Sequence, residues 1–307
     1  MMRRPGFGNM PPVPDPGPQT VVSGRATVRL WVGVAITVAI IAALWVPLDI
    51  ESHLTQMRQQ FVALRYIQKA SQAAIAPPVQ RKKIIGMADR ALAANPDDAM
   101  IRRRAATTYM SVRAYDEAIE ILRGLPNRGL IMDSYLGHCL LASGELEAGE
   151  KVMQSVLSRA KLQRRKGTMA PSTYAVLLNS VGYGYSVGGI RLNDARSLLR
   201  EALGIQPLQP AFIDSLGWIY YSLGDFHEAL FYLERAVRLM GPQENAEIYY
   251  HLGAAYARMG RVRKAKRALQ NCLRLEPDFE KARDELEVLG LKLPNPPCVW
   301  NAASKNS

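Results

Sequence analysis

The chain has 307 residues, with 39 Lys and Arg against 27 Asp and Glu, a formal net charge of +12 and 48% hydrophobic residues. This composition is typical of an ordered globular protein and excludes disordered and collagen-like chains. The cysteines stand far apart at Cys139, Cys272 and Cys298. Their spacing excludes a disulfide scaffold and a cysteine-rich zinc site.

The first 29 residues are predicted to form a flexible, proline-rich tail. Six prolines fall within the first 20 residues, and each removes a backbone donor and fixes its own φ angle, which favours extended chain. Such tails are commonly spacers, and a ligand for an SH3-type domain is the alternative.

An uncharged stretch from Leu30 to Leu48 is predicted to be a transmembrane helix. Its 19 residues would span about 28 Å at about 1.5 Å per residue, close to the hydrocarbon thickness of a bilayer. Trp31 and Trp45 lie near its ends, where indole rings favour the membrane interface. The alternative is a cleaved signal peptide, but the apolar run and the tail before it are both long for one.

Positive charges flank this stretch unequally. The tail before it carries four arginines against one acid, whereas the near flank after it carries Arg58 and Arg65. The positive-inside tendency therefore favours a cytoplasmic amino terminus. We expect a single-pass membrane protein, as in a bacterial inner membrane, with the bulk of the chain on the exoplasmic or periplasmic side.

The remainder of the chain contains an internal repeat. Three segments share an apolar residue followed by glycine, an aromatic residue three positions later and a second glycine seven positions later. These residues are Val181-Gly182, Tyr185 and Gly189; Leu216-Gly217, Tyr220 and Gly224; and Leu252-Gly253, Tyr256 and Gly260. Each segment continues with a small residue, a leucine and another small residue: Ala195, Leu199 and Ala202; Ala229, Leu233 and Ala236; and Ala265, Leu269 and Cys272.

The pattern predicts a helical hairpin in each segment. A glycine at the crossing lets two helices approach closely, the second glycine ends the first helix, and the apolar spacing buries one face of the second helix. Pro207, Gly241-Pro242 and Pro277 then close the three units, because proline cannot continue a helix.

These residues resemble the tetratricopeptide repeat (TPR), specifically over about 175–279 and more weakly over 79–160. The resemblance implies an all-α chain of tandem helical hairpins stacked as a superhelical solenoid, preceded here by the transmembrane helix. It assigns a structural role within the repeats to Gly182, Tyr185, Pro207, Gly217, Tyr220, Gly224, Ala229, Ala236, Gly253, Tyr256, Gly260, Ala265 and Pro277.

Upstream, the period persists in diverged form. Leu136-Gly137 and Gly144 mark one diverged unit, and Tyr109 and Tyr115 mark another in which Arg113 stands where the turn glycine belongs. The expected domains are the tail 1–29, the transmembrane helix 30–48, a connecting helix with a degraded first repeat 50–97, diverged repeats with a basic loop 98–174, three clear repeats 175–279, and a capping helix with a flexible tail 280–307.

The resemblance also implies a concave groove lined by the first helix of each hairpin. The corresponding positions are Arg103, Thr107, Ser134, His138, Asn179, Tyr183, Asp214, Trp218, Tyr221, Glu247 and Tyr250. This mixture of polar and aromatic side chains suits an extended peptide. For Trp218 and Tyr221, packing between adjacent repeats is an equally weighted alternative.

The sequence offers no catalytic, cofactor or metal site. The glycines from Gly182 to Gly188 lack the spacing and the preceding strand of a nucleotide loop, and the four histidines lack metal-ligand spacing. Basic clusters lie at 81–83, 102–104, 164–166 and 261–267, where acidic lipids or proteins could bind, although solvated outer helices explain them as well. Nucleic-acid binding is not expected, because no recognised module accompanies the charge.

We therefore expect a membrane-anchored, non-enzymatic scaffold or adaptor that binds protein partners through its groove, in assembly or folding of an envelope complex. The alternative is a regulatory subunit that recruits substrates to a membrane enzyme such as a protease or secretion machinery. Everything beyond binding rests on analogy, because repeat arrays share a fold while serving unrelated processes.

Overall fold

The computed structural model describes the backbone of residues 24–75, 77–242 and 244–290, and the side chains of these ranges from residue 50 onward. The chain divides into two compact units, Met1–Met57 and Arg58–Ser307. Thirteen helices and no strand occur among the described residues. The prediction of an all-α chain is confirmed.

Helix α1 runs from Gly24 to Ile75. The predicted transmembrane helix, 30–48, falls within α1, but its side chains lie outside the described residues. Within the part of the chain whose side chains are described, no helix is both long and apolar enough to cross a membrane. Residues 1–23 of the predicted tail and the chain after Gly290, with Cys298, also lie outside the described part.

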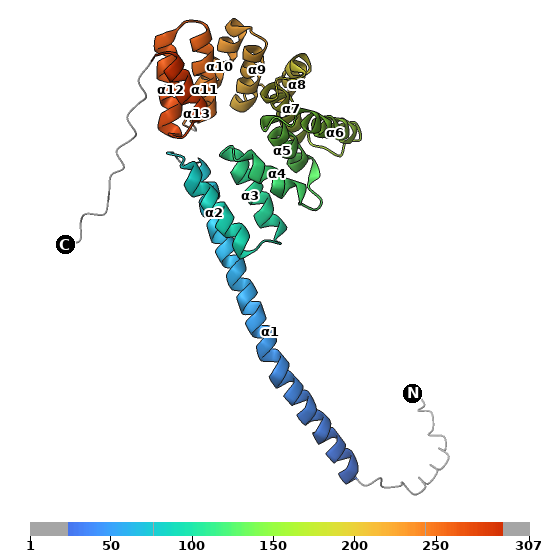
Figure 1. Ribbon diagram of the computed structural model, residues 1–307. Helices are drawn as coiled ribbons and strands as arrows, with labels where there is room; N and C mark the ends of the chain where they lie inside the picture. The colour runs from blue at the N-terminus through green and yellow to red at the C-terminus, as the bar shows by residue number, and fades with distance from the viewer. Residues whose placement is uncertain (1–23, 76, 243, 291–307) are drawn as a thin grey trace, which may run out of the picture. The chain divides into compact units, whose positions relative to one another are not determined.

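The second unit is a row of antiparallel helical hairpins that follow one another along the chain (Figure 1). The helices after α1 are α2 (Arg81–Ala94), α3 (Ala99–Ser111), α4 (Tyr115–Arg123), α5 (Gly129–Ala142), α6 (Leu146–Arg165), α7 (Pro171–Val187), α8 (Leu192–Ile205), α9 (Pro210–Ser222), α10 (Phe226–Met240), α11 (Ala246–Arg258), α12 (Val262–Leu275) and α13 (Glu280–Val288). The end of α1 packs on α2 through Ala63, Ile67 and Ile84, and α13 packs on α12.

Short polar residues and prolines begin several of these helices. The Asp98 carboxylate accepts hydrogen bonds from the N–H groups of Met100 and Ile101 at the start of α3. The Asn245 side chain does the same for α11, and Pro171 occupies the first turn of α7. Each device satisfies or removes a backbone donor that the first turn leaves free, and so fixes where the helix starts.

One turn geometry joins the two helices of five successive hairpins. In each, the residue after the turn donates its N–H to the carbonyl oxygen five residues earlier, at 2.8–2.9 Å: Ala114 to Tyr109, Glu145 to Leu140, Ile190 to Tyr185, Asp225 to Tyr220 and Arg261 to Tyr256. The residue before this donor is left-handed, as at Gly224 and Gly260, which favours glycine. Arg113 adopts the same conformation with φ of +58°.

The crossing glycines bring the two helices of a hairpin into direct contact. A Cβ atom added to Gly217 would lie 2.8 Å from Leu233 Cγ, and one added to Gly253 would lie 2.7 Å from Leu269 Cγ. At Gly182 the corresponding distance to Leu199 Cδ2 is 2.1 Å. Any side chain larger than glycine at these positions would push the helices apart.

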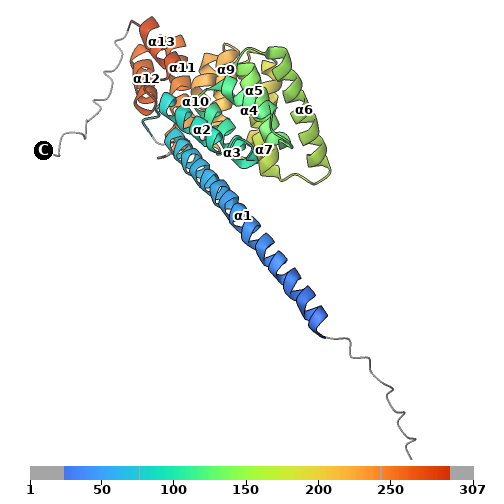
Figure 2. The same cartoon turned by 60° about the horizontal axis from the view of Figure 1, so that its bottom comes forward.

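The two ends of the hairpin row touch each other. The N–H of Val79, just before α2, donates to the carbonyl oxygen of Leu275 at the end of α12, at 2.9 Å. In the ribbon views the connection between α1 and α2, which holds Val79, is the part of the first repeat that approaches the last helices (Figures 1 and 2). The first and last repeats are therefore joined directly at this point.

Candidate partner-binding surface

The structure gathers most of the predicted groove residues into one cluster inside the hairpin row. We call it the inner cluster, and its members are Tyr115, His138, Tyr183, Asp214, Trp218, Tyr221, Glu247, Tyr250, His251 and Phe279. They come from α4, α5, α7, α9 and α11, and from the residue that precedes α13. Helical spacing explains two pairs, Asp214 with Trp218 and Glu247 with His251, because residues four apart share a helix face.

Aromatic rings connect the members of the inner cluster. From Tyr115 the ring centroids run to His138 at 5.9 Å, on to Tyr183 at 5.5 Å and then to His251 at 6.2 Å. The Trp218 ring lies 4.1 Å from His251, 4.4 Å from Tyr221 and 5.8 Å from Tyr250. The Tyr250 ring in turn lies 5.0 Å from Phe279. Trp218 and Tyr221 stack on each other and are both half-buried. Their rings thus pack between repeats and still reach solvent.

Two carboxylates are held between these rings. Glu247 Oε1 accepts a hydrogen bond from the Tyr183 hydroxyl at 2.7 Å, and the Asp214 carboxylate lies 3.0 Å from His251 Nδ1. Asp214 and His251 are only 6% and 2% exposed. The Asp214 side chain is therefore not available to a ligand in this state.

Burial shapes the acid–base properties of the cluster. Burial raises the pKa of Asp214, against the lowering effect of His251, and lowers the pKa of His138 from 6.5. Burial alone would raise the pKa of Glu247, but His251, the Tyr183 hydroxyl and Arg113 together bring it below its usual value. At neutral pH we therefore expect a neutral His138 ring beside an ionised Glu247.

The remaining predicted residues lie apart from the inner cluster or at its border. Arg103 donates to the carbonyl oxygen of Asn127 at 2.8 Å and Thr107 to that of Arg104 at 2.9 Å, so both are engaged locally. Ser134 is buried and accepts a hydrogen bond from Ser180 at 3.0 Å. Asn179 lies at the border of the cluster, in a cavity wall with Tyr183.

A set of side chains that the sequence did not mark as a site closes the row. The Arg113 guanidinium forms an ion pair with Glu276, which is 5% exposed, and stacks over the Phe279 ring at 4.1 Å. We call Arg113, Glu276 and Phe279 the closing contact. The repeat pattern marks Arg113 only as a substituted turn glycine, and no local signal pairs it with a residue 163 positions away.

Two cavities adjoin the inner cluster and share Ser111, Arg113 and Glu247 in their walls. One, of about 640 Å³, lies at the closing contact. The other, of about 300 Å³, is lined by residues of α3, α4, α5, α7 and α11. Both cavities therefore reach Glu247, a member of the inner cluster.

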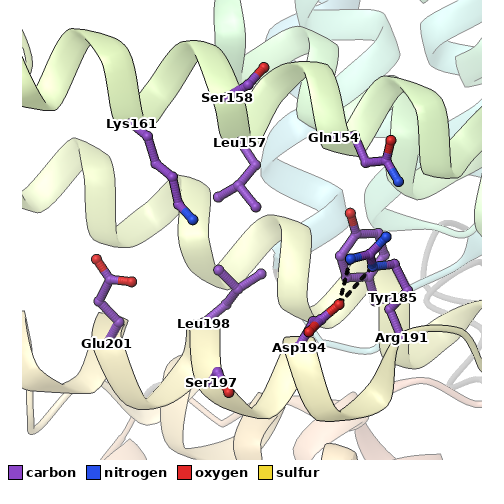
Figure 3. A pocket seen from close by; sticks show the side chains of 10 residues that line it. All are labelled: Gln154, Leu157, Ser158, Lys161, Tyr185, Arg191, Asp194, Ser197, Leu198 and Glu201. Carbon is purple, nitrogen blue, oxygen red and sulfur yellow. Dashed lines mark hydrogen bonds and ion pairs between the residues drawn. The ribbon is translucent and has the colours of Figure 1, made fainter.

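A further pocket, of about 440 Å³, lies between the second helices α6 and α8 (Figure 3). Leu157 and Leu198 face each other across it, with Lys161 and Glu201 towards one end and Arg191 bonded to Asp194 at the other (Figure 3). None of the predicted groove residues lines this pocket.

The described residues contain no group of three or more His, Cys, Asp or Glu side chains placed to hold a metal ion. Cys139 and Cys272 are buried, and burial raises the pKa of both thiols. Each therefore behaves as a small core residue.

Comparison with known proteins agrees with this architecture. A family model described as tetratricopeptide repeat matches residues 211–241 and 246–286, which span α9 to α13. A TPR repeat-containing protein of Pseudomonas aeruginosa is 37% identical over 79 residues, or 26% of this chain and 13% of that protein. The match thus spans well under two thirds of its length.

Two solved structures share the fold at low sequence identity. A tetratricopeptide repeat protein from Parabacteroides merdae is 11% identical, covers 68% of this chain and 78% of its own, and superposes with a TM-score of 0.52. A monomeric mutant of IFIT1 with Gppp-AAAA is 16% identical, covers 68% of this chain and 49% of its own, and has a TM-score of 0.51. These likenesses show the helical-repeat fold alone.

Proposed function

We propose that this chain, whose residues 211–241 and 246–286 match the tetratricopeptide repeat, is a membrane-anchored scaffold that binds an extended segment of a partner protein along its inner cluster. The observation that carries the proposal is the connected set of aromatic rings on the first helices, with half-buried rings at Trp218, Tyr221 and Tyr250. Such rings offer large apolar faces and polar edges at little cost in side-chain entropy.

The anchor is proposed from the uncharged residues 30–48. With the amino terminus in the cytoplasm, as the flanking arginines favour, the repeats of a bacterial inner-membrane protein would lie in the periplasm. Confinement to the membrane raises the effective concentration of the array near membrane-bound partners, so that modest contacts can retain them. We propose assembly or folding of an envelope complex as the process served.

The double variant Trp218→Ala with Tyr221→Ala tests the binding surface. After cross-linking in membranes and purification in mild detergent, we expect at least a tenfold loss of recovered partner, because the stacked rings present the largest apolar faces of the cluster. Phe231→Ala is the matched control, since Phe231 is 56% exposed on the second helix α10.

Unchanged recovery by the double variant, with a native circular dichroism spectrum, would show that partners bind elsewhere. The identity of the recovered proteins separates the two proposed roles. A spread of incompletely assembled proteins supports a scaffold, whereas one enzyme at fixed stoichiometry supports a substrate-recruiting subunit.

A further inference from the structure

The smaller inner cavity has walls suited to one kind of chemical group. Its volume is about 300 Å³, and its lining includes Tyr115, Tyr135, His138, Asn179, Tyr183 and Glu247. Val176, which also lines the cavity, is 39% exposed to solvent. A slender side chain could therefore enter without unfolding the array.

Glu247 supplies a carboxylate that no described side chain contacts in a direct ion pair, although the charges of Arg113 and His251 act on it from a distance. Among the described side chains, Arg113 forms its ion pair with Glu276, and His251 lies against Asp214. Glu247 has no ion pair in that part of the chain, and its carboxylate accepts a hydrogen bond from the neutral Tyr183 hydroxyl. A half-buried carboxylate of this kind gains from a cationic partner.

Asn179 supplies a second acceptor. Its Oδ1 atom is buried in the cavity wall and has no hydrogen-bond partner. Leaving a buried acceptor unpaired is costly, so the geometry at Asn179 favours a ligand that donates a hydrogen bond.

Aromatic rings and a neutral imidazole make up much of the remaining wall. Tyr183 stacks on His138, and Tyr115 packs edge-on against the same ring. Ring faces attract cations, and His138 adds no positive charge, since burial lowers its pKa. The one guanidinium in the lining, Arg113, is already held by Glu276 and Phe279.

From this juxtaposition we propose that the cavity binds a primary ammonium group, with Glu247 and Asn179 as acceptors and the tyrosine rings as walls. The ammonium would be carried by a lysine side chain of the bound segment or by a small free diamine. The lysine source rests on the proposed function and specifies the partner: an extended segment with a lysine at the position that meets α7 and α11.

The test uses the full chain in detergent and three probes: the peptide acetyl-Ala-Lys-Ala-amide, the same peptide with norleucine in place of lysine, and putrescine. Binding is measured by calorimetry. We expect the lysine peptide or putrescine to bind at least tenfold more tightly than the norleucine peptide, which has a similar shape without the charge. Preference for the peptide identifies a lysine side chain as the source, and binding of putrescine alone identifies a free diamine.

Two variants locate the site. Glu247→Gln should weaken ammonium binding at least tenfold, since the amide oxygen can still accept from Tyr183 while the charge is lost. Glu234→Gln is the matched control, because Glu234 also accepts a tyrosine hydroxyl, that of Tyr256 at 2.6 Å, but does not line the cavity. Asn179→Asp should strengthen binding, because it adds a second negative charge.

Equal binding of the norleucine peptide, absence of binding by both ammonium probes, or equal effects of Glu247→Gln and Glu234→Gln would overturn the proposal. None of these outcomes bears on partner recovery by the Trp218 and Tyr221 variants. The ammonium site and the proposed function can therefore fail separately.

Discussion

Glycine residues show how a single missing methyl group sets the spacing of the helices. A Cβ atom on Gly217 would meet both the side chain of Leu233 and its backbone nitrogen, at 2.8 and 3.2 Å. A Cβ atom added to Gly86, within α2, would have no neighbouring atom within 4 Å. The same substitution should therefore have opposite effects at the two positions.

Gly217→Ala should lower the free energy of unfolding by about 1–3 kcal/mol, because the new methyl group forces α9 and α10 apart. Gly86→Ala should raise it by about 0.5–1 kcal/mol, because alanine restricts the unfolded chain and suits a helix interior. Urea denaturation followed by circular dichroism measures both. A stable Gly217→Ala protein would show that the helix crossing is looser than the contact distances indicate.

His138 gives the inner cluster a pH dependence. A half-buried histidine whose pKa is lowered from 6.5 binds fewer protons when folded than when unfolded, so its contribution to stability is present above 6.5 and is lost as the pH falls through the folded pKa. We expect His138→Phe, which retains a ring against Tyr183, to lose less stability than the wild type between pH 7 and pH 5. The measurement is the denaturation midpoint of each protein as a function of pH. If the midpoints of the two proteins change with pH in parallel, His138 is not the source of the pH dependence.

At the scale of elements, local sequence patterns account for the hairpins but not for how the row closes. Pro171, the glycines of the turns and the crossing glycines each act within one hairpin, so their spacing predicts α7 to α12. Arg113 illustrates the limit, because its left-handed turn follows from the repeat pattern but its ion pair joins residues 163 positions apart. Likewise, the sequence placed Tyr183 and Glu247 on one inner surface, whereas their hydrogen bond depends on the curvature of the whole row.

Glu276→Gln tests whether the closing contact stabilises the two ends of the hairpin row. The change keeps the shape of the side chain but leaves the Arg113 guanidinium without its charged partner, which should cost about 2 kcal/mol of local stability. Hydrogen exchange should quicken in α2, α12 and α13 while α7 and α8 keep their protection. Glu244→Gln is the control, because the Glu244–Arg274 pair is exposed and contributes little.

If protection in α2 and α12 is unchanged by Glu276→Gln, the ends of the row are joined mainly by the backbone bond from Val79 to Leu275 and by apolar packing. The charge pair would then be incidental to closure.

At the scale of the whole molecule, the proposed anchor makes a prediction about the side of the membrane on which each end of the chain lies. A reporter fused after Ser307 that is active only outside the cytoplasm should give a signal, and a cytoplasm-specific reporter should not. Deletion of residues 30–48 should abolish the exoplasmic signal, which serves as the control. The reverse pattern would place the repeats in the cytoplasm and direct the search for partners there.

The contact between the first and last repeats also has a kinetic consequence. While this contact holds, a partner segment with folded domains at both of its ends could not be threaded between the first and last repeats, and would enter from the side once they had separated. Association with such a partner would be limited by the rate of separation and would stop increasing at high partner concentration. Once the ends rejoin, the same barrier would slow release, so that a complex of modest affinity could be long-lived.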